Sequence, residues 1–278
     1  MTRIRINDIE LNVITSGAGA PLVLLHGFTG SAANWTTHRA VFDRHFQTAA
    51  IDLLGHGASD APADAERYRM TRGVDDLRAC FDKLNLQRVH LLGYSMGGRV
   101  ALHFAHKYPE RIETLILESA SPGIADAAER AARIASDQVL AERIEREGIA
   151  AFVAYWEQRP LFATQARLSQ ATRDALHAQR LQNNPRGLAN SLRGMGTGAQ
   201  ESLWERLPQI HTRTLLITGA LDEKFTNIAR QMSEIMPNAR HVSIADAGHA
   251  AHVERPMEFE KIVLKGLRTD HWSLVTDY

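Results

Sequence analysis

A serine flanked by glycines is the first group in this sequence with the setting of a reactive nucleophile. Residues 93–97 read GYSMG, with Ser95 at the centre; an apolar run (89–92) precedes them and a helical pattern (96–107) follows. A strand, a sharp turn permitted by the glycines and a helix would lift the serine hydroxyl above a sheet, at a helix N-terminus that favours negative charge. We predict that Ser95 is the reactive group. The alternative is a chance turn rich in glycine and serine.

Two later residues could activate this serine. Asp222 lies just beyond a predicted strand at 214–219, and His249 follows an apolar run at 241–244. The order serine, aspartate, histidine accompanies this type of serine motif, and strand ends are where such sheets carry their chemistry. The sequence therefore predicts His249 as base and Asp222 as the group that orients it. Asp222 could instead be a turn or cap residue, His249 one of many surface histidines, and His252 a competing base.

Two backbone N–H groups are predicted to stabilise negative charge on the reacting substrate. One belongs to Met96, directly after the serine. The other belongs to Phe28, which ends the segment His26-Gly27-Phe28 after the apolar run 22–25. A motif of this type uses N–H groups from these two places. The Phe28 ring could also line the pocket.

Cationic side chains close to the serine indicate the kind of substrate. Arg99 follows Ser95 by four residues, which places it one helical turn further on and on roughly the same face. A salt bridge or a surface position explains Arg99 equally well on spacing alone. Further cations are available at Arg130, Arg133, Arg180 and Lys224. Several cations around one serine would suit a substrate with multiple carboxylates, whereas an ordinary esterase pocket would be more apolar.

Elements that could position these residues alternate along the chain. Apolar runs at 22–25, 48–53, 89–92, 114–117, 214–217 and 241–244 predict buried strands, and helical patterns lie at 71–84, 96–107 and 226–235. Residues 3–15 predict an opening hairpin that turns at Asn7 and Asp8. The alternation predicts an α/β fold with a mostly parallel sheet. Residues 122–210 read as a helical lid inserted between a first core part (1–121) and a second (211–267), and residues 268–278 form a tail without assignment.

Composition narrows the possible partners. The chain has 278 residues, 32 basic and 32 acidic side chains and one cysteine. The balance of charge argues against a general nucleic-acid binder, and a single cysteine allows no internal disulfide. No apolar run suggests a signal peptide or a membrane span, so a soluble cytoplasmic protein is expected. No His-Glu-x-x-His or strand-linked G-x-G-x-x-G motif is present, and we expect neither a metal nor an organic cofactor.

Motifs throughout the chain resemble those of one enzyme family, the 2-succinyl-6-hydroxy-2,4-cyclohexadiene-1-carboxylate synthases of menaquinone biosynthesis, which have the α/β-hydrolase fold. The resemblance runs from about residue 5 to about residue 265 and includes the lid, which varies widely among enzymes of this fold. The matching segments are 25–31 (LHGFTGS) with Trp35, 93–99 (GYSMGGR), 118–123 (ESASPG), 155–157 (YWE), 160–162 (PLF), 183–184 (NN), 187–189 (GLA), 191–192 (SL), 194–198 (GMGTG) and 222–225 (DEKF).

The resemblance implies a lyase that eliminates pyruvate from 2-succinyl-5-enolpyruvyl-6-hydroxy-3-cyclohexene-1-carboxylate, a small substrate with three carboxylates. Ser95, activated through His249, would remove the proton next to the succinyl ketone, without an acyl-enzyme. The implied carboxylate-binding residues are Arg99, Arg133, Arg180 and Lys224, with Arg130 as an alternative to Arg133. Tyr94 and Trp156 would shape the pocket.

Two other classes of function are compatible with the same residues. A carboxylesterase or C–C bond hydrolase would use the same triad to form a covalent acyl or tetrahedral intermediate. A non-catalytic receptor of the same fold would not need the intact triad. Turnover of the enolpyruvyl substrate, compared with that of a simple aryl ester, separates the three.

Overall fold

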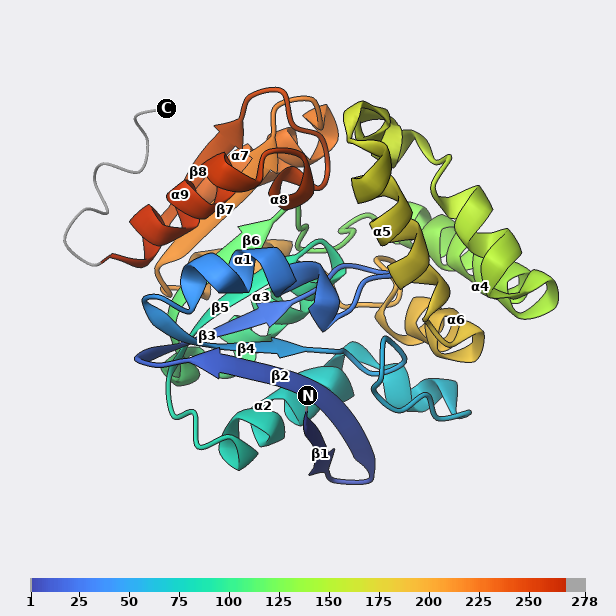
Figure 1. Ribbon diagram of the computed structural model, residues 1–278, viewed down its shortest axis with the longest axis horizontal. Helices are drawn as coiled ribbons and strands as arrows, with labels where there is room; N and C mark the ends of the chain where they lie inside the picture. The colour runs from blue at the N-terminus through green and yellow to red at the C-terminus, as the bar shows by residue number, and fades with distance from the viewer. Residues whose placement is uncertain (1, 269–278) are drawn as a thin grey trace.

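An eight-stranded sheet forms the centre of the molecule (Figure 1). The computed structural model describes residues 2–268. The strands follow one another across the sheet in the order β1-β2-β4-β3-β5-β6-β7-β8. Their bounds are β1 Thr2–Ile6, β2 Ile9–Gly17, β3 Ala20–Leu25, β4 Phe46–Ile51, β5 Val89–Tyr94, β6 Ile112–Glu118, β7 Thr214–Gly219 and β8 Ala239–Ile244. Each predicted apolar run lies within a strand except 48–53, whose last two residues, Asp52 and Leu53, lie beyond the end of β4.

The sheet is antiparallel at one edge and parallel elsewhere. β1 and β2 form the predicted hairpin, and its turn places Asn7 in the left-handed region with φ 54°. β2 pairs antiparallel with β4, and every later pairing is parallel. The carboxyl ends of the parallel strands therefore meet at one edge of the sheet. The expected α/β architecture with a mostly parallel sheet is confirmed.

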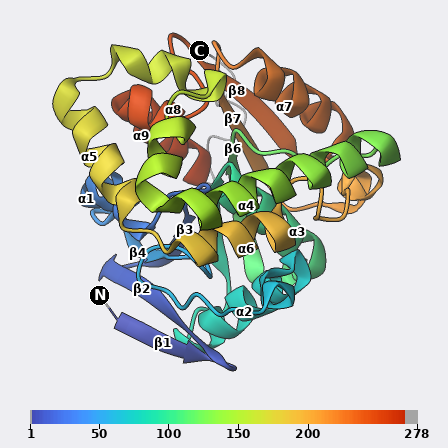
Figure 2. The ribbon, with the colours of Figure 1, turned by 90° about the vertical axis from the view of Figure 1, so that its right-hand side faces the viewer.

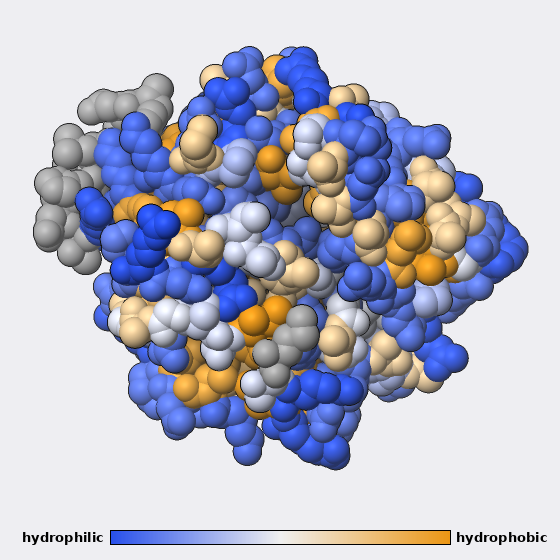
Figure 3. All heavy atoms as spheres, viewed as in Figure 1, coloured by the Kyte–Doolittle hydropathy of each residue, from blue (hydrophilic) through white to orange (hydrophobic). Residues whose placement is uncertain are grey.

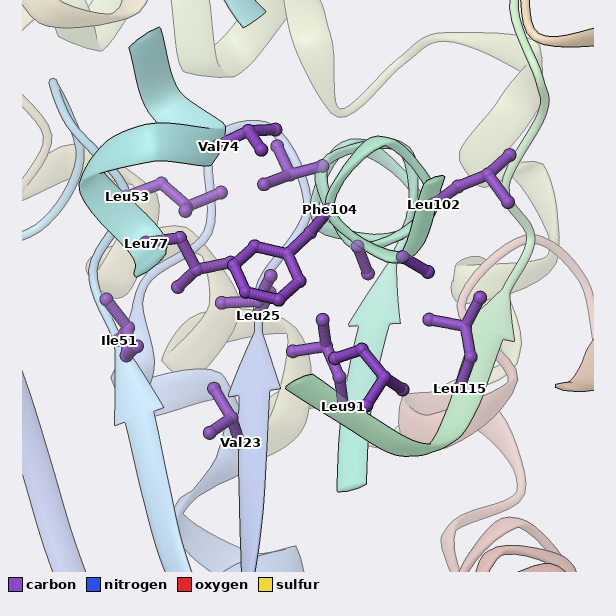
Figure 4. Packing of buried hydrophobic residues seen from close by; sticks show 14 of the residues in the cluster. Val23, Leu25, Ile51, Leu53, Val74, Leu77, Leu91, Leu102, Phe104 and Leu115 are labelled. Carbon is purple, nitrogen blue, oxygen red and sulfur yellow. The ribbon is translucent and has the colours of Figure 1, made fainter. Parts of the chain in front are cut away.

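Helices cover both faces of the sheet. Residues of α2 (Met70–Lys83), α3 (Met96–Lys107) and α7 (Glu223–Ile235) share one buried cluster with the strands, and residues of α1 (Thr36–Phe42) and α9 (Pro256–Leu267) share another. Figure 4 shows the first cluster, where Leu77 and Phe104 pack over Leu25 and Leu91. The sequence patterns predicted α2, α3 and α7, although α7 begins earlier than expected. They did not include α1 and α9.

A helical segment separates β6 from β7. It contains α4 (Ala127–Trp156), α5 (Gln170–Leu181) and α6 (Pro185–Met195), called here the inserted helices. They lie together at one end of the sheet (Figures 1 and 2). A separate small core that includes Ile144, Phe152 and Leu188 holds α4 against α6. α4 is bent at Gly148, whose φ of 78° and ψ of 173° are not helical.

Short helices complete the connections. In the described part of the chain, five are 3₁₀ helices: η1 Ala32–Trp35, η2 Ala65–Tyr68, η3 Pro109–Arg111, η4 Pro160–Arg167 and η5 Trp204–Gln209; α8 spans Ala251–Glu254. Of the tail predicted at 268–278, all but Arg268 lies outside the described residues. On the face seen in Figure 3, hydrophilic residues predominate and hydrophobic ones gather in small patches. Within residues 2–268, no helix is both long and apolar enough to span a bilayer.

Candidate active site

Ser95 lies at the sharp turn between β5 and α3. Its φ of 50° and ψ of −105° are unusual for a residue with a side chain, and its N–H donates to the carbonyl of Glu118 on β6 at 2.8 Å. The turn needs glycine on both sides of the serine. A Cβ atom at Gly93 would lie 2.4 Å from the Gly97 carbonyl oxygen, and one at Gly97 would lie 2.5 Å from the Leu25 oxygen. Both approaches are too close for a side chain, which explains the glycine spacing read from the sequence.

His249 and Asp222 lie beside this serine. The Nε2 atom of His249 is 3.0 Å from Ser95 Oγ, and its Nδ1 atom is 2.7 Å from Asp222 Oδ2. The imidazole and the carboxylate are only 2% and 9% exposed. With the Nδ1 proton donated to Asp222, Nε2 is free to accept the serine proton. Asp222 also caps α7, where its Oδ1 accepts from the Phe225 N–H at 3.4 Å, so the helix N-terminus favours its charge.

His252, the competing base, has a different partner. Its Nδ1 and its backbone N–H both lie 2.9 Å from Glu118 Oε1, and both side chains are buried. Its ring packs against Tyr94, with the two centroids 4.6 Å apart. The structure thus brings His249, and not His252, to the serine hydroxyl.

The loop after β3 approaches the serine closely. A Cβ atom at Gly27 would lie 3.5 Å from the Ser95 Cβ and 2.6 Å from the Tyr94 ring. The next residue, Phe28, lines the same cavity as Ser95 and Met96. Among residues 2–268, no acceptor is found for the backbone N–H of Phe28 or of Met96. Two unpaired N–H groups beside a serine hydroxyl are available for an oxyanion.

His26 holds this loop in place. Its Nε2 accepts from the Leu53 N–H at 3.0 Å, and its Nδ1 lies 2.8 Å from the Gly27 carbonyl oxygen. Burial lowers the pKa of His26 to about 4, so the ring is neutral and can donate from Nδ1 while it accepts at Nε2. His26 thus fixes the backbone that leads to Phe28.

A cavity of about 830 Å³ opens over the serine and the inserted helices. Its wall contains Ser95 and His249 together with aromatic side chains such as Tyr94, Trp156 and Phe162. Five cationic side chains also line it, whereas Asp137 is the one carboxylate found in the lining among the described residues. The five cations are Arg99, Arg133, Arg143, Arg159 and Lys224. In a chain with equal numbers of basic and acidic residues, this lining is strongly positive and suits a polyanionic ligand.

Most of the substrate-binding residues predicted from the sequence lie in this wall, but one does not. Tyr94, Trp156, Arg99, Arg133 and Lys224 line the cavity. Arg180 is absent from the lining: it is buried, donates to Glu157 at 2.8 Å and lies over the Phe162 ring. Arg130, the alternative to Arg133, is likewise not among the lining residues.

Burial holds the pKa of Tyr94 well above its usual value, and the Glu118 carboxylate raises it further, so the phenol is a hydrogen-bond donor.

Arg99 and Arg133 share the Asp137 carboxylate as the nearest negative charge. Arg133 donates to Asp137 Oδ1 at 2.8 Å. Arg99 donates through Nη1 to two neutral acceptors, the Met195 carbonyl and Gln200 Oε1, each at 2.5 Å. Burial, followed by repulsion from Arg133, lowers the pKa of Arg99 to about 10, which still leaves it charged at neutral pH. Burial raises the pKa of Asp137, while Arg133 opposes this.

Three charged residues of the lining had no place in the sequence predictions: Asp137, Arg143 and Arg159. Asp137 follows Arg133 by four residues, a helical spacing that could have indicated the pair. Arg159 lies between two family-like segments, 155–157 and 160–162, and could have been noticed there. Arg143 has no local signal, because only the packing of α4 brings it to the cavity.

Comparison with known proteins first identifies the structural class of the chain. Over residues 20–256 the chain matches the family described as alpha/beta hydrolase fold, which confirms the expected fold class. A solved thermophilic esterase from Thermogutta terrifontis, with malate bound, has a TM-score of 0.85 and 27% identity, covering 98% of this chain and 100% of its own.

More similar relatives share one designation. A 2-succinyl-6-hydroxy-2,4-cyclohexadiene-1-carboxylate synthase of Serratia proteamaculans is 34% identical, over 86% of this chain and 89% of its own length. A Bacillus subtilis protein, named provisionally as the same synthase, is 49% identical, over 88% of this chain and 89% of its own. The structure of MenH from S. aureus has a TM-score of 0.88 and 36% identity, covering 92% of this chain and 97% of that one. The chain belongs to the 2-succinyl-6-hydroxy-2,4-cyclohexadiene-1-carboxylate synthase family of the α/β-hydrolase fold.

Proposed function

We propose that this protein eliminates pyruvate from 2-succinyl-5-enolpyruvyl-6-hydroxy-3-cyclohexene-1-carboxylate and forms 2-succinyl-6-hydroxy-2,4-cyclohexadiene-1-carboxylate. The observation that carries the proposal is the cavity, where five cations and one carboxylate surround a serine paired with a histidine. The substrate carries three carboxylates, one on the ring, one on the succinyl arm and one on the enolpyruvyl group. Family membership supports the same activity.

The contacts of the triad suggest how the reaction begins. His249 Nε2 takes the proton of the Ser95 hydroxyl, while Asp222 stabilises the imidazolium through Nδ1. The serine oxygen removes the ring proton next to the succinyl ketone, and the C–H electrons move toward the ketone oxygen. Backbone N–H groups of Phe28 and Met96 would donate to that oxygen. No covalent bond to the serine is needed.

Release of the leaving group completes the elimination. The electrons return from the ketone oxygen and shift through the ring double bond, so that a second ring double bond forms and the C–O bond to the enolpyruvyl group breaks. The departing enolate takes a proton and becomes pyruvate. The proton that Ser95 removed can return from the serine or from His249, so the triad ends in its starting state.

A comparison of two substrates tests this function. Purified protein should release pyruvate from the enolpyruvyl substrate, and Ser95→Ala should abolish most of this release. A small neutral aryl ester is the control, because the alternative function is an esterase with the same triad. Rapid ester hydrolysis without pyruvate release would overturn the proposal in favour of that alternative.

A further inference from the structure

Tyr155 holds two of the cavity arginines at one place on the wall. The Cζ atom of Arg143 lies 3.8 Å from the centroid of the Tyr155 ring, and Nη1 of Arg159 donates to the Tyr155 hydroxyl at 2.8 Å. All three residues line the cavity, and Tyr155 and Arg143 belong to the two parts of α4 on either side of Gly148. We name them the Tyr155 cluster. Stacking on an aromatic ring restrains a guanidinium and leaves its edges free to donate.

The donors of this cluster are only partly used. Arg143 donates through Nε to Glu147 at 2.7 Å, and Glu147 also accepts from Arg146. Arg159 makes no ion pair with any carboxylate of residues 2–268. A guanidinium has five N–H donors, so both arginines retain donors that a planar acceptor could use in pairs. The chemistry that matches such an arrangement is a carboxylate.

The cluster is distinct from the cations next to the serine. Trp156, the neighbour of Tyr155, packs on Phe28 and Phe162 with ring centroids 5.3 and 5.6 Å apart, and Phe162 in turn packs on His249. A row of packed rings therefore leads from the triad to Trp156, the residue that follows Tyr155 in α4. Arg99 and Arg133, by contrast, lie with Asp137, which offsets part of their charge. No carboxylate in the cavity wall, as far as it is described, contacts Arg159.

We propose that the Tyr155 cluster is a second carboxylate-binding site, which holds one carboxylate of the substrate at a wall of the cavity that Arg99 does not serve. This rests on the proposed function, because it assigns a substrate class to the same cavity. The cluster determines specificity: it selects ligands with several separated carboxylates over those with one. It takes no part in proton transfer, so its loss affects KM and leaves kcat nearly unchanged.

A matched pair of variants tests this site. Arg159→Gln removes the unpaired charge of the cluster, and Arg146→Gln removes an exposed arginine of α4 that also touches Glu147 but does not line the cavity. We expect Arg159→Gln to raise KM for the enolpyruvyl substrate about tenfold with kcat within about twofold, since one charge-assisted contact is lost. Arg146→Gln should match the wild type. Tyr155→Phe, which keeps the stacking but loses the hydroxyl, should give a smaller rise.

Binding of benzene-1,3,5-tricarboxylate can be measured without turnover, so it tests the Tyr155 cluster separately from the proposed function. Calorimetry on Ser95→Ala protein measures its affinity without any turnover, and benzoate serves as the ligand with a single carboxylate. Arg159→Gln in that background should weaken binding of the tricarboxylate about tenfold and leave benzoate unaffected. Equal affinities for Arg159→Gln and Arg146→Gln, or no saturable binding to Ser95→Ala protein, would overturn the site. Absence of pyruvate release with intact tricarboxylate binding would overturn the function alone.

Discussion

Two buried histidines three residues apart have different environments in this protein. His249 contacts Ser95 and Asp222, whereas His252 contacts the Glu118 carboxylate and the Tyr94 ring. Both pairings join a histidine to an acid, but only the first leaves a ring nitrogen against a hydroxyl. The difference in role therefore comes from what the second nitrogen contacts. It does not come from residue type or burial.

The triad should behave as one unit. Ser95→Ala should lower kcat for pyruvate release by about 10³-fold or more, because the proton acceptor is lost while the cations that bind the substrate remain. The double variant Ser95→Ala/His249→Ala should be little worse than the single one. Steady-state kinetics measures both, and an unchanged circular dichroism spectrum shows that the fold persists. Additive losses in the double variant would contradict the assignment.

Glu118 should matter for stability through His252. Glu118 is fully buried, and its Oε1 accepts both the backbone N–H and Nδ1 of His252. Glu118→Ala leaves two buried donors without an acceptor, so we expect a loss of about 2–5 kcal/mol in the free energy of unfolding. Glu118→Gln keeps an oxygen at the same place and should cost less. Urea denaturation of the two variants gives the comparison; equal losses would contradict this role for the carboxylate oxygen.

Arg99 should distinguish the lyase from an esterase. Removing a charge-assisted contact to a substrate carboxylate costs about 2–5 kcal/mol, so Arg99→Ala should lower kcat/KM for the enolpyruvyl substrate about 30-fold or more. Hydrolysis of a neutral aryl ester, if measurable, should change far less. Arg99→Lys should restore activity only in part, because a point charge cannot reproduce the fork.

The contacts that Arg99 makes in the structure also define the result that would contradict this prediction. Its Nη1 donates to the Met195 carbonyl and to Gln200, so the substitution also removes one contact of α3 with the end of α6 and one with the segment after it. A parallel fall of both activities would show that Arg99 supports the shape of the cavity, and the carboxylate argument for this residue would fail.

Residues near the serine could be predicted from the sequence better than residues of the inserted helices. The positions of Ser95, Met96 and Arg99 follow from one local turn and one helix. Arg180 illustrates the limit: the sequence offered it as a cation of the lid and the resemblance implied a contact with the substrate, but neither contained its ion pair with Glu157. The packing of the inserted helices on one another decides which face of each helix lines the cavity. The spacing of residues along a single helix does not contain that information.

At the scale of elements, strands were easier to predict than short helices. Buried parallel strands give continuous apolar runs, and each predicted run overlaps a strand, although the run 48–53 ends beyond β4. α1 covers only Thr36–Phe42, about two turns, which is too short for a clear helical period. α9 did carry a signal: Pro256 stands at its first position, and Phe259, Ile262 and Val263 follow at helical spacing.

The bend in α4 makes Gly148 a position where substitution should matter. Its φ of 78° and ψ of 173° belong to a region that residues with a Cβ atom avoid, although no atom outside the adjoining residues and the nearby helix backbone lies within 4 Å of the Cβ that alanine would add. The cost of Gly148→Ala is therefore conformational, about 1–3 kcal/mol. We expect lower stability or a straighter α4 that moves Tyr155 and Trp156, and hence a raised KM. Ala150→Gly, at an exposed helical position nearby, is the control.

An unchanged urea midpoint and an unchanged KM in Gly148→Ala would show that α4 accepts another local geometry at no cost. A fall in stability without any change in KM would restrict the bend to a structural role.

At the scale of the whole molecule, buried neutral histidines predict sensitivity to acid. Burial is the largest cause that lowers the pKa of five of them to about 3 or 4: His26, His38, His56, His90 and His103. In the unfolded chain these rings bind protons near pH 6.5, whereas in the folded protein they stay neutral until about pH 4. The unfolded state therefore binds more protons in this window, and stability falls as the pH is lowered through it.

The expected size of this effect is large. Each such histidine costs about 1.4 kcal/mol for every pH unit below its unfolded pKa, until its folded pKa is reached. Urea midpoints should therefore fall steeply from pH 7.5 to pH 5, a range above the usual pKa of carboxylates. The slope of the free energy of unfolding against pH should correspond to the uptake of several protons on unfolding. A urea midpoint that stays constant over this range would contradict the neutral state of these rings.

The inserted helices lie between β6 and β7, and this position sets an order of events while the chain folds. Ser95 and His249 are 154 residues apart, and His249 and Asp222 both follow strands at the β8 edge of the sheet. Until residues 119–213 have been made and β7 has arrived, β6 is an unpaired edge and Ser95 has no base. The separate core of the inserted helices lets them become compact during that interval. We therefore expect a half-built sheet with an open β6 edge to be the stage of synthesis most exposed to aggregation.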